Sequence, residues 1–151
     1  MNESKGENQM NKKVLAALGV VLMLSGCSHS AVKCEGFKEE FRHDEVLFSS
    51  GKAELTAKGK KVLDKQISWL KKNPEKKIII EGYTDPRGTE AYNMKLGEKR
   101  AEAVKKYITN AGINPNRVSV VSLGETELAT TQNTPKGWTE DRRTVTVIVT
   151  D

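Results

Sequence analysis

The chain has very few of the side chains on which most catalytic and metal sites depend. Its 151 residues include two histidines and two cysteines, and all four lie before residue 44. Cys27, His29, Cys34 and His43 lack the paired C-x2–4-C spacing of structural zinc sites. A hydrolase would need a nucleophile with its base, an acid–base pair or a metal, and no such set accompanies the acidic residues of the later chain. We therefore expect no metal, no cofactor and no catalytic activity.

Aromatic residues are also scarce, at 5% of the chain, whereas charged residues make up 30% and give a formal net charge of +5. The lysines and arginines form no stripe interleaved with aromatic side chains, which is the pattern of a surface that binds nucleic acid. We therefore expect no nucleic-acid partner. The mild positive charge favours an anionic polymer or surface instead. The length leaves room for one domain and a short appendage, since domains commonly contain ~100–150 residues.

No apolar run is long enough to span a membrane. The longest, Val14–Leu24, has 11 residues, whereas a spanning helix needs ~20. Lys12 and Lys13 precede this run, and small residues follow it. A basic start, a short apolar run and small residues at the end are typical of a secretory signal peptide. We therefore predict that residues 1–26 are a signal peptide.

The end of this run, "LSGC" (residues 24–27), resembles the lipobox of bacterial lipoproteins, in which the cysteine is lipidated and becomes the first residue of the mature protein. The alternative is an ordinary signal peptide that contains a cysteine by chance. The resemblance implies lipidation at Cys27, and Ser28 in place of aspartate after it implies export to the outer membrane. Residues 1–9 precede a second methionine, Met10, from which the signal begins cleanly, so the true start is open.

Residues 27–42 show no sustained hydrophobic period, and we predict that they form a tether after the lipidated cysteine. At ~3.3–3.6 Å per extended residue, such a tether reaches a few tens of ångströms from its anchor. Cys34 would then lack a partner in an oxidising compartment, which leaves either a free thiol or a disulfide between two molecules. The remaining residues, 43–151, are predicted to form one folded domain.

The first half of this domain region predicts strand, helix and strand. A short strand is expected at residues 46–48. A helix capped by Thr56 should follow and end at about Lys72, because Pro74 disfavours helical geometry at the residue before it. Apolar residues in the helix recur near a period of 3.6, which indicates one buried face. The run Ile78–Ile80 predicts an inner strand covered on both faces.

The second half predicts a helix and two more strands. The helix is expected from Thr89–Glu90 to just before Gly112, and a strand over Val118–Ser122. Residues 123–141 are predicted to be a long polar loop without a helix. The last strand is expected in "RRTVTVIVT", with three valines on one face: Val145, Val147 and Val149. The order β-α-β-α-β-β predicts an α+β fold in which helices pack on a mixed four-stranded sheet.

Arg100 falls on the apolar stripe of the second helix, where a charge destabilises the fold unless it is paired or reaches water. One interpretation is an arginine at the edge of the stripe that snorkels to water or pairs with Glu81 or Asp85. The other is a guanidinium positioned for a carboxylate, since its planar donors bind both oxygens at once. The residues alone leave both interpretations open.

Asp85 lies just beyond a predicted strand end, in the turn "TDPRG". It could serve the turn alone by accepting from backbone amides. It could also line a ligand site, because α/β folds commonly place such sites at this edge of the sheet. Before the last strand, "EDRR" supplies Arg142 and Arg143. Adjacent strand residues point to opposite sides, so at most one should face a given site, and both could simply be edge charges that deter aggregation.

The segment "GYTDPRGTEAYNMKLGEKRAEAVKKYI" (Gly82–Ile108) resembles the peptidoglycan-binding signature of the OmpA-like domain family. The T-D turn, the Y-N pair, the leucine and the R-A pair occur in the family's order and spacing, and the likeness covers nearly all of residues 45–149. It implies that family's fold and non-covalent binding of peptidoglycan. With the lipobox and the tether, it implies a lipoprotein that ties the outer membrane to the cell wall.

In that family the aspartate and the arginine of this motif grip diaminopimelate, the wall-peptide residue whose side-chain end bears an ammonium and a carboxylate. Matched by position, Asp85 would accept from the ammonium and Arg100 would bind the carboxylate. Asn93 and Leu96 match positions that border the pocket, and one of the two arginines of "EDRR" matches the family's terminal basic pair. Charge-assisted hydrogen bonds of ~1.5–3 kcal/mol each would distinguish diaminopimelate from lysine, which lacks the carboxylate.

The first loop departs from the family, which often has aspartate where this chain has Ser49 and Ser50. No ligand contact is therefore carried over to that loop. The resemblance also implies a protein partner, the periplasmic β-propeller protein of the Tol system, and a role in envelope integrity and cell division. The alternative function is an OmpA-like domain that acts mainly as a docking module for periplasmic partners.

Overall fold

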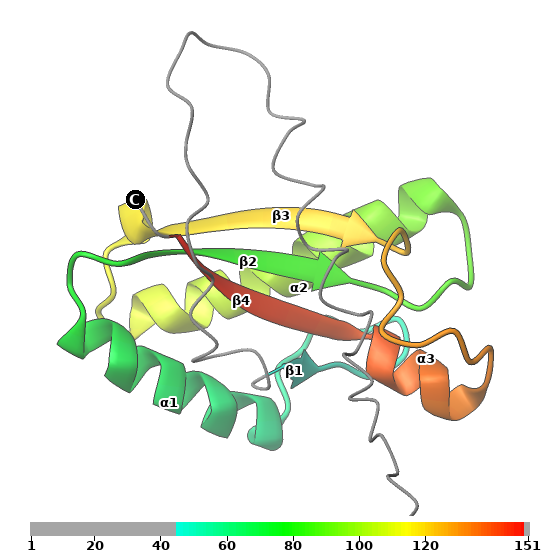
Figure 1. Cartoon of the computed structure of the whole chain (residues 1–151), viewed down its shortest axis with the longest axis horizontal. Coiled ribbons are helices and arrows are strands. Elements are labelled where there is room, and N and C mark those ends of the chain that lie inside the picture. The colour runs from blue at the N-terminus through cyan, green and yellow to red at the C-terminus, as the bar shows by residue number, and fades with distance from the viewer. Residues whose placement is uncertain (1–44, 150–151) are drawn as a thin grey trace, which may run out of the picture. The chain divides into compact units, whose positions relative to one another are not determined.

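The computed structural model describes residues 45–149 of the chain (Figure 1). The predicted signal peptide, lipidation site and tether lie outside the described residues, as do both cysteines, both histidines and the two ends of the predicted domain. The elements, in chain order, are β1 (Val46–Leu47), α1 (Ala57–Lys72), β2 (Lys77–Tyr83), α2 (Glu90–Asn110), the 3-10 turn η5 (Pro115–Arg117), β3 (Val118–Gly124), α3 (Pro135–Asp141) and β4 (Arg143–Val149).

The strands form one mixed sheet in the order β1-β4-β2-β3. β2 and β3 are parallel neighbours, and α2 connects them. β4 lies between β1 and β2 and is antiparallel to both. α1 and α2 contribute to one hydrophobic core with β2, and α3 lies beyond one end of β4 (Figure 1). This confirms the predicted α+β fold with helices packed on a mixed four-stranded sheet.

The two long helices begin and end where the sequence predicted. Thr56 caps α1, since its side-chain oxygen accepts from the Gly59 amide at 3.0 Å, and Thr89 caps α2 in the same way by accepting from the Tyr92 amide. Gly112 follows the end of α2 with φ +95°, a conformation that glycine adopts without the steric penalty of a side chain. The local signals of capping and helix termination therefore decide both helices.

The core lies on the helix side of the sheet. Ile78 and Ile80 are almost fully buried there, whereas Ile79, which points to the other side, is only half-buried. The prediction that this run is covered on both faces is therefore wrong in degree. In β4 the three valines do share a face, but the face toward the helices is the opposite one, on which Thr144 and Thr146 are buried. All members of the core cluster lie between Val46 and Val118, so the described region contains its own core.

The prediction that residues 123–141 lack a helix is wrong, because α3 occupies residues 135–141. Its start follows the ordinary rules: the Thr134 side chain accepts from the Gly137 amide at 3.2 Å, and Pro135 occupies the first turn. The helix is short and polar, so it has no apolar period to reveal it.

None of the helices within residues 45–149 is both long and apolar enough to cross a bilayer.

A contact between two glycines sets the position of α2 on β2. A Cβ atom on Gly82 would lie 2.0 Å from the Gly97 carbonyl oxygen, and one on Gly97 would lie 2.3 Å from the Ser122 hydroxyl. Only residues without side chains allow backbones to approach so closely. Because of this close approach, the first turns of α2 pack directly against the end of β2. Arg100 therefore lies near the turn that follows the strand.

Candidate functional site

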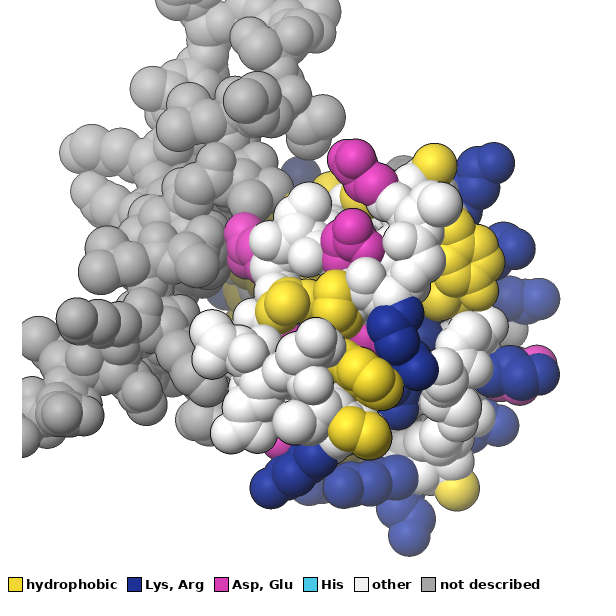
Figure 2. Space-filling view, turned by 90° about the vertical axis from the view of Figure 1, so that its right-hand side faces the viewer, with side chains coloured by type: hydrophobic (Ala, Val, Ile, Leu, Met, Phe, Trp, Pro, Cys, Tyr) yellow, Lys and Arg dark blue, Asp and Glu magenta, His cyan; other side chains and the backbone are white. Residues whose placement is uncertain are grey.

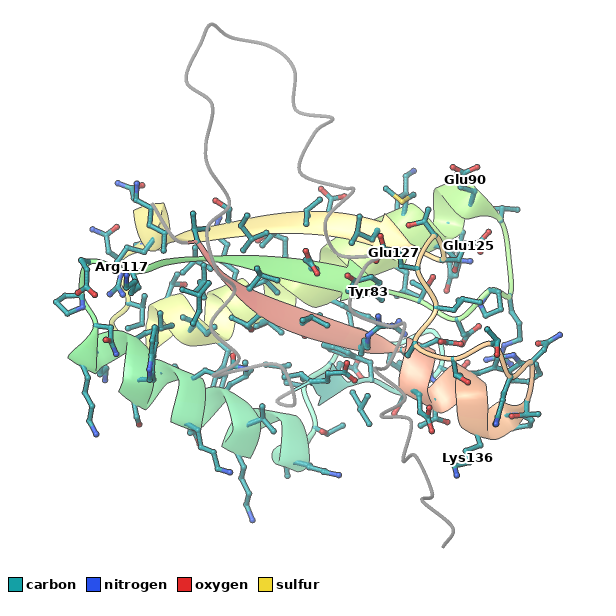
Figure 3. All side chains as sticks on the ribbon, viewed as in Figure 1. Tyr83, Glu90, Arg117, Glu125, Glu127 and Lys136 are labelled. Atoms are coloured by element: carbon teal, nitrogen blue, oxygen red, sulfur yellow. The ribbon has the colours of Figure 1, made fainter. Side chains whose placement is uncertain are left out.

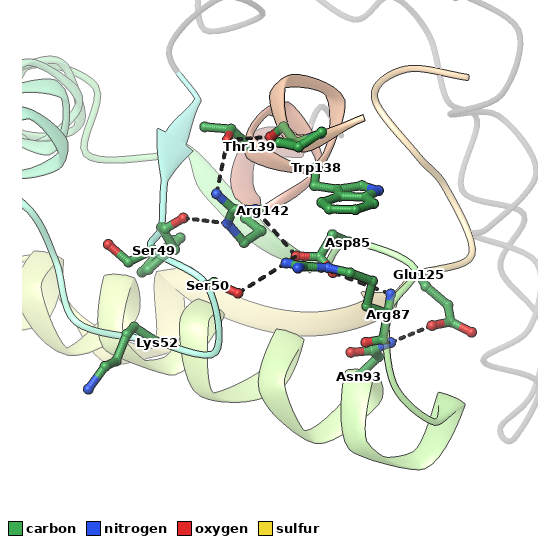
Figure 4. A network of polar contacts seen from close by, with 12 residues as sticks. Ser49, Ser50, Lys52, Asp85, Arg87, Asn93, Glu125, Trp138, Thr139 and Arg142 are labelled. Carbon is green, nitrogen blue, oxygen red and sulfur yellow. Dashed lines mark hydrogen bonds and ion pairs between the residues drawn. The ribbon is translucent and has the colours of Figure 1, made fainter. Parts of the chain in front are cut away.

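Asp85 is the second residue after β2, and arginines hold its carboxylate (Figure 4). Arg87 binds it side-on, with Nε 2.9 Å from Oδ1 and Nη2 2.9 Å from Oδ2. The Arg87 backbone amide donates to Oδ1 at 3.3 Å, which is the turn contact that the sequence allowed. Nη1 of Arg142 lies 3.4 Å from Oδ2. Asp85 therefore serves its own turn and also joins two arginines.

Burial and hydrogen bonding act on the Asp85 carboxyl in opposite directions. Asp85 is 7% exposed, and burial alone raises the pKa of a carboxyl group because it disfavours the charged form. The hydrogen bonds from the Arg87 side chain and backbone, the charge of Arg87 and the hydrogen bond from Arg142 outweigh this effect, so the pKa of Asp85 lies below its ordinary value. Asp85 is therefore an anion at neutral pH.

Arg100 is fully buried and donates to three backbone carbonyls. Nε reaches the Lys52 carbonyl at 2.8 Å, Nη1 the Tyr83 carbonyl at 2.8 Å, and Nη2 the Ser49 carbonyl at 3.2 Å. These bonds use three of the five N–H donors of the guanidinium and fix the first loop against the end of β2. The side chain neither snorkels to water nor forms an ion pair with Glu81 or Asp85 among the described contacts.

The positive charge of Arg100 is held at an energetic cost. Burial, and to a smaller extent the nearby charge of Arg142, lower the pKa of Arg100 to about 10, while the charge of Asp85 opposes the shift. The guanidinium still remains protonated at neutral pH. A buried cation of this kind is stabilised by an anion, because the anion replaces the hydration that the cation has lost. Arg100 is thus suited to a carboxylate ligand.

Four of the predicted site residues line one pocket of about 120 Å³, here called the Asp85 pocket. They come from the turn after β2 and from the first three turns of α2. Residues of the first loop complete the wall. The lining consists of Ser50, Gly51, Thr84, Asp85, Arg87, Tyr92, Asn93, Leu96 and Arg100. The side of the molecule that faces the viewer in Figure 2 carries basic, acidic and apolar side chains next to one another.

Asn93 and Leu96 border the pocket as predicted, and each has a second task. The Asn93 amide nitrogen donates to the Arg87 carbonyl at 3.2 Å and to the Glu125 carboxylate (Figure 4). It therefore joins the turn after β2 to the loop after β3. Leu96 is 8% exposed and supplies an apolar wall on the helix side. Both residues keep the pocket in shape around the charged groups.

The structure separates the two adjacent arginines that precede the last strand. Arg142 belongs to the site: besides Asp85, it donates to the Phe48 carbonyl at 3.0 Å and to the Thr139 hydroxyl at 3.0 Å. Arg143 lies on the sheet side that faces away from the helices, where its guanidinium stacks 3.9 Å from the Tyr83 ring and its Nε lies 3.5 Å from Glu45. The predicted role of Arg143 at the site therefore has no support in this geometry.

Sequence reasoning missed Arg87, Trp138 and Thr84. Arg87 donates to the Ser50 hydroxyl at 3.0 Å and lies 4.3 Å from the centre of the Trp138 ring (Figure 4). Its partners lie 37 and 51 positions away in the chain, so no local pattern reveals them. Thr84 lines the pocket, and its hydroxyl is buried without a hydrogen-bond partner within residues 45–149. The only sequence signal for a role of Thr84 at the site was its position directly before Asp85.

The pocket carries an excess of positive charge. Arg87, Arg100 and Asp85 line the pocket, and two groups lie just outside the lining: Arg142, which contacts Asp85, and Glu125, which contacts Asn93. Such an arrangement favours a ligand with at least one carboxylate, and Asp85 provides a place for a cationic group on the same ligand. Across residues 45–149, no three histidine, cysteine or acidic side chains come together in a way that could hold a metal ion.

A larger hollow of about 290 Å³ lies between α2 and β3, away from Asp85. Its lining is Met94, Lys95, Glu98, Val120, Val121 and Ser122. The charged residues in this lining are exposed, so they are solvated and require no ligand. Size alone would favour this hollow. The smaller Asp85 pocket is the better candidate because two of the charged residues in its lining, Asp85 and Arg100, are buried and border the same cavity.

Several known proteins are similar to this chain in sequence and in fold. A peptidoglycan-associated lipoprotein of Pasteurella multocida is 34% identical over 143 residues, which covers 88% of this chain and 95% of the relative. One of Rhizobium meliloti is 30% identical over 152 residues, with 89% and 86% covered. The crystal structure of the peptidoglycan-associated lipoprotein from Burkholderia pseudomallei has a TM-score of 0.68 and 31% identity, covering 70% of this chain and 89% of that one.

The crystal structure of the C-terminal domain of Helicobacter pylori MotB has the same fold, with a TM-score of 0.66 over 71% of this chain and 84% of that one, but its 20% identity indicates the fold alone. Residues 47–142 match the OmpA family, and this span includes every residue that lines the Asp85 pocket. The chain belongs to the OmpA family.

Proposed function

We propose that this protein is an outer-membrane lipoprotein that binds peptidoglycan non-covalently through the diaminopimelate of the stem peptide, and so tethers the outer membrane to the cell wall. Membership of the OmpA family and the names of its relatives support the peptidoglycan part of this proposal. One observation carries the finer part: Asp85 and Arg100 line the same pocket although a turn and three helical turns separate them in the chain.

The two charges suit the two ends of the diaminopimelate side chain. Asp85 is the only carboxylate among the residues that line the pocket, and it accepts from the ammonium. Arg100 donates to the carboxylate with the N–H groups that its three carbonyl bonds leave over. Lysine has the ammonium and no carboxylate, so it leaves the buried Arg100 without an anion. The protein acts by binding, and no chemical step is assigned to the pocket.

A pull-down of residues 43–151 with purified peptidoglycan sacculi tests this proposal. Asp85→Ala and Arg100→Ala should each lose most of the binding, because each removes one half of the clamp. Arg117→Ala is the matched control: Arg117 also donates to three backbone carbonyls, but at the opposite end of β2. Undiminished binding by the Asp85 and Arg100 variants would refute the pocket. Turnover of wall fragments would point to a hydrolase instead.

The anchor belongs to the same proposal. Residues 1–26 serve as the signal peptide, Cys27 carries the lipid, and residues 27–42 form the tether of the domain at 43–151. The relative from Pasteurella multocida matches 88% of this chain, so the likeness reaches beyond the described residues into this segment. Mass spectrometry of Cys27→Ser should show loss of the acyl mass that the natural chain carries. An unchanged mass would reject lipidation.

A docking role for periplasmic proteins is the second candidate, with the Tol system's β-propeller protein as the partner. Within residues 45–149, three large hydrophobic side chains are exposed: Tyr92 at 51%, Leu128 at 43% and Met94 at 37%. Tyr92 also lines the Asp85 pocket, so a protein bound there would cover the wall site. Met94→Ser with Leu128→Ser, at exposed residues outside the lining of the Asp85 pocket, should weaken partner binding and leave binding to sacculi nearly unchanged. An equal loss of partner binding and of binding to sacculi would show that the two functions share their contacts.

A further inference from the structure

The Asp85 carboxylate has no acceptor position to spare. A carboxylate offers about four lone-pair positions on its two oxygens. Oδ1 accepts from the Arg87 backbone amide and from Arg87 Nε, and Oδ2 accepts from Arg87 Nη2 and from Arg142 Nη1. Three of the four donors belong to Arg87. An ammonium that reaches Asp85 must therefore displace an existing donor.

Arg87 is the donor that can leave. Its side chain is 46% exposed, whereas that of Arg142 is 12% exposed and is also fixed by the Phe48 carbonyl and the Thr139 hydroxyl. Arg87 is held at the pocket mouth by two further contacts, the Ser50 hydroxyl and the face of Trp138. A guanidinium that releases Asp85 can keep its place over the indole ring, because stacking does not use its N–H donors.

The charges at the pocket then require a second anion. With an ammonium on Asp85 and a carboxylate on Arg100, Arg87 would be left as a cation at the pocket mouth without its previous partner. Peptidoglycan supplies a suitable group beside the diaminopimelate: the neighbouring D-glutamate is joined through its γ-carboxyl, so its α-carboxylate is free. A planar fork of N–H donors is well matched to such a carboxylate.

We infer that Arg87 exchanges carboxylates when the ligand binds: it leaves Asp85 to the incoming ammonium and takes a second carboxylate of the peptide. This inference rests on the proposed function and extends it. The pocket would then prefer a peptide with two free carboxylates, one for Arg100 and one for Arg87. Amidation of the second carboxylate would weaken binding through Arg87 alone, since Arg100 keeps its own partner.

A double-mutant cycle between protein and ligand tests the inference. Residues 43–151 and their Arg87→Gln variant are titrated by calorimetry with L-alanyl-γ-D-glutamyl-meso-diaminopimelate and with the same tripeptide amidated at the D-glutamate α-carboxyl. Amidation should weaken binding to the natural sequence about 10-fold, the usual effect of losing one charge-assisted hydrogen bond. It should weaken binding to Arg87→Gln less than about 2-fold. Lys136→Gln, which removes an exposed positive charge from α3, should behave like the natural sequence.

The outcomes separate the exchange from a simple block. If Arg87 only occupies Asp85, Arg87→Gln should bind both tripeptides more tightly and to the same extent, so amidation would weaken both proteins equally. That result would overturn the exchange and leave the proposed function intact. If the natural sequence binds neither tripeptide and also fails to pellet with sacculi, the proposed function falls, and the exchange falls with it.

Discussion

Two arginines at opposite ends of β2 make the same kind of contact and are suited to different tasks. Arg100 donates to the carbonyls of Lys52, Tyr83 and Ser49. Arg117 donates to those of Lys76, Leu70 and Asn73, at the far end of the strand (Figure 3). Each fixes the connections at its end of the sheet. Three bonds to carbonyls are therefore a structural device and do not by themselves indicate a ligand.

The surroundings make the difference. Arg100 is fully buried, lines a pocket and has Asp85 and Arg142 close enough to affect its pKa. Arg117 is half-buried and lines neither of the two pockets described above. A binding role is thus indicated by burial, a cavity and neighbouring charges taken together. The same comparison supplies a natural control for each substitution at the site.

Replacing the two arginines should give the largest difference. Arg100→Gln and Arg117→Gln each remove bonds to three carbonyls, and an unsatisfied buried group costs ~1–3 kcal/mol, so each variant should lose about 2–4 kcal/mol of unfolding free energy in urea titrations. Only Arg100→Gln should also lose binding to sacculi, by about tenfold or more. Equal binding loss in both variants would mean that general destabilisation explains the Arg100 effect.

Replacement of Gly82, near the end of β2, should destabilise the fold more than replacement of Gly112, which follows α2. Gly82→Ala places a Cβ 2.0 Å from the Gly97 carbonyl oxygen, and such overpacking costs about 1–3 kcal/mol or more. Gly112→Ala meets no atom within 4 Å but keeps φ at +95°, so its cost is the smaller backbone strain of about 1–2 kcal/mol. The melting temperature of Gly82→Ala should therefore be lower than that of Gly112→Ala. The reverse order would contradict the close approach of α2 to β2.

Replacement of two buried threonines by valine should affect the stability of the fold differently. The Thr84 hydroxyl is buried without a partner within the described region, whereas the Thr146 hydroxyl donates to Gln66 at 2.9 Å. Thr84→Val removes an unsatisfied group, so the melting temperature should stay level or rise. Thr146→Val breaks a satisfied bond and should cost about 1 kcal/mol. A larger loss at Thr84 than at Thr146 in calorimetric scans would show that the Thr84 hydroxyl is already satisfied.

Acid should affect the Asp85 end and spare the Arg117 end. The folded-state pKa of Asp85 lies below its ordinary value of 3.8, so the ionised carboxylate stabilises the fold above about pH 4, and this stabilisation is lost as the pH falls through the lower folded-state value. Asp85→Asn should flatten this part of the stability curve between pH 5 and 2. Arg117→Gln should leave its slope unchanged. A curve for Asp85→Asn parallel to that of the natural sequence would contradict the assignment.

Local patterns predicted most of the fold. Threonine caps, a proline stop and the 3.6-residue period fixed α1 and α2, because each signal acts within a few residues. α3 was missed, since its seven residues carry no apolar period and its local signal is limited to the cap, Thr134 before Pro135. In β4 alternation predicted that the three valines share one face, and only the pairing with β2 shows that the other face, with Thr144 and Thr146, is the one toward the helices.

The site was predicted only as far as family likeness allowed. Asp85 and Arg100 were identified as candidates, but the three carbonyl partners of Arg100 lie 17 to 51 positions away. The same holds for Arg87, whose partners Ser50 and Trp138 come from different parts of the chain. Alternation along a strand predicted that only one of Arg142 and Arg143 faces the site, and the structure selects Arg142. Contacts between distant segments cannot be read from local sequence.

The central claim is that the Asp85 end of the domain recognises the ammonium and carboxylate of diaminopimelate together. Equilibrium binding of residues 43–151 to soluble wall tripeptides with either diaminopimelate or lysine at the third position tests it most directly. Tighter binding of the diaminopimelate peptide by about tenfold or more, with the preference kept in Arg117→Gln and lost in Arg100→Gln, is the predicted result. Equal affinity for the two peptides in the natural sequence would contradict the claim.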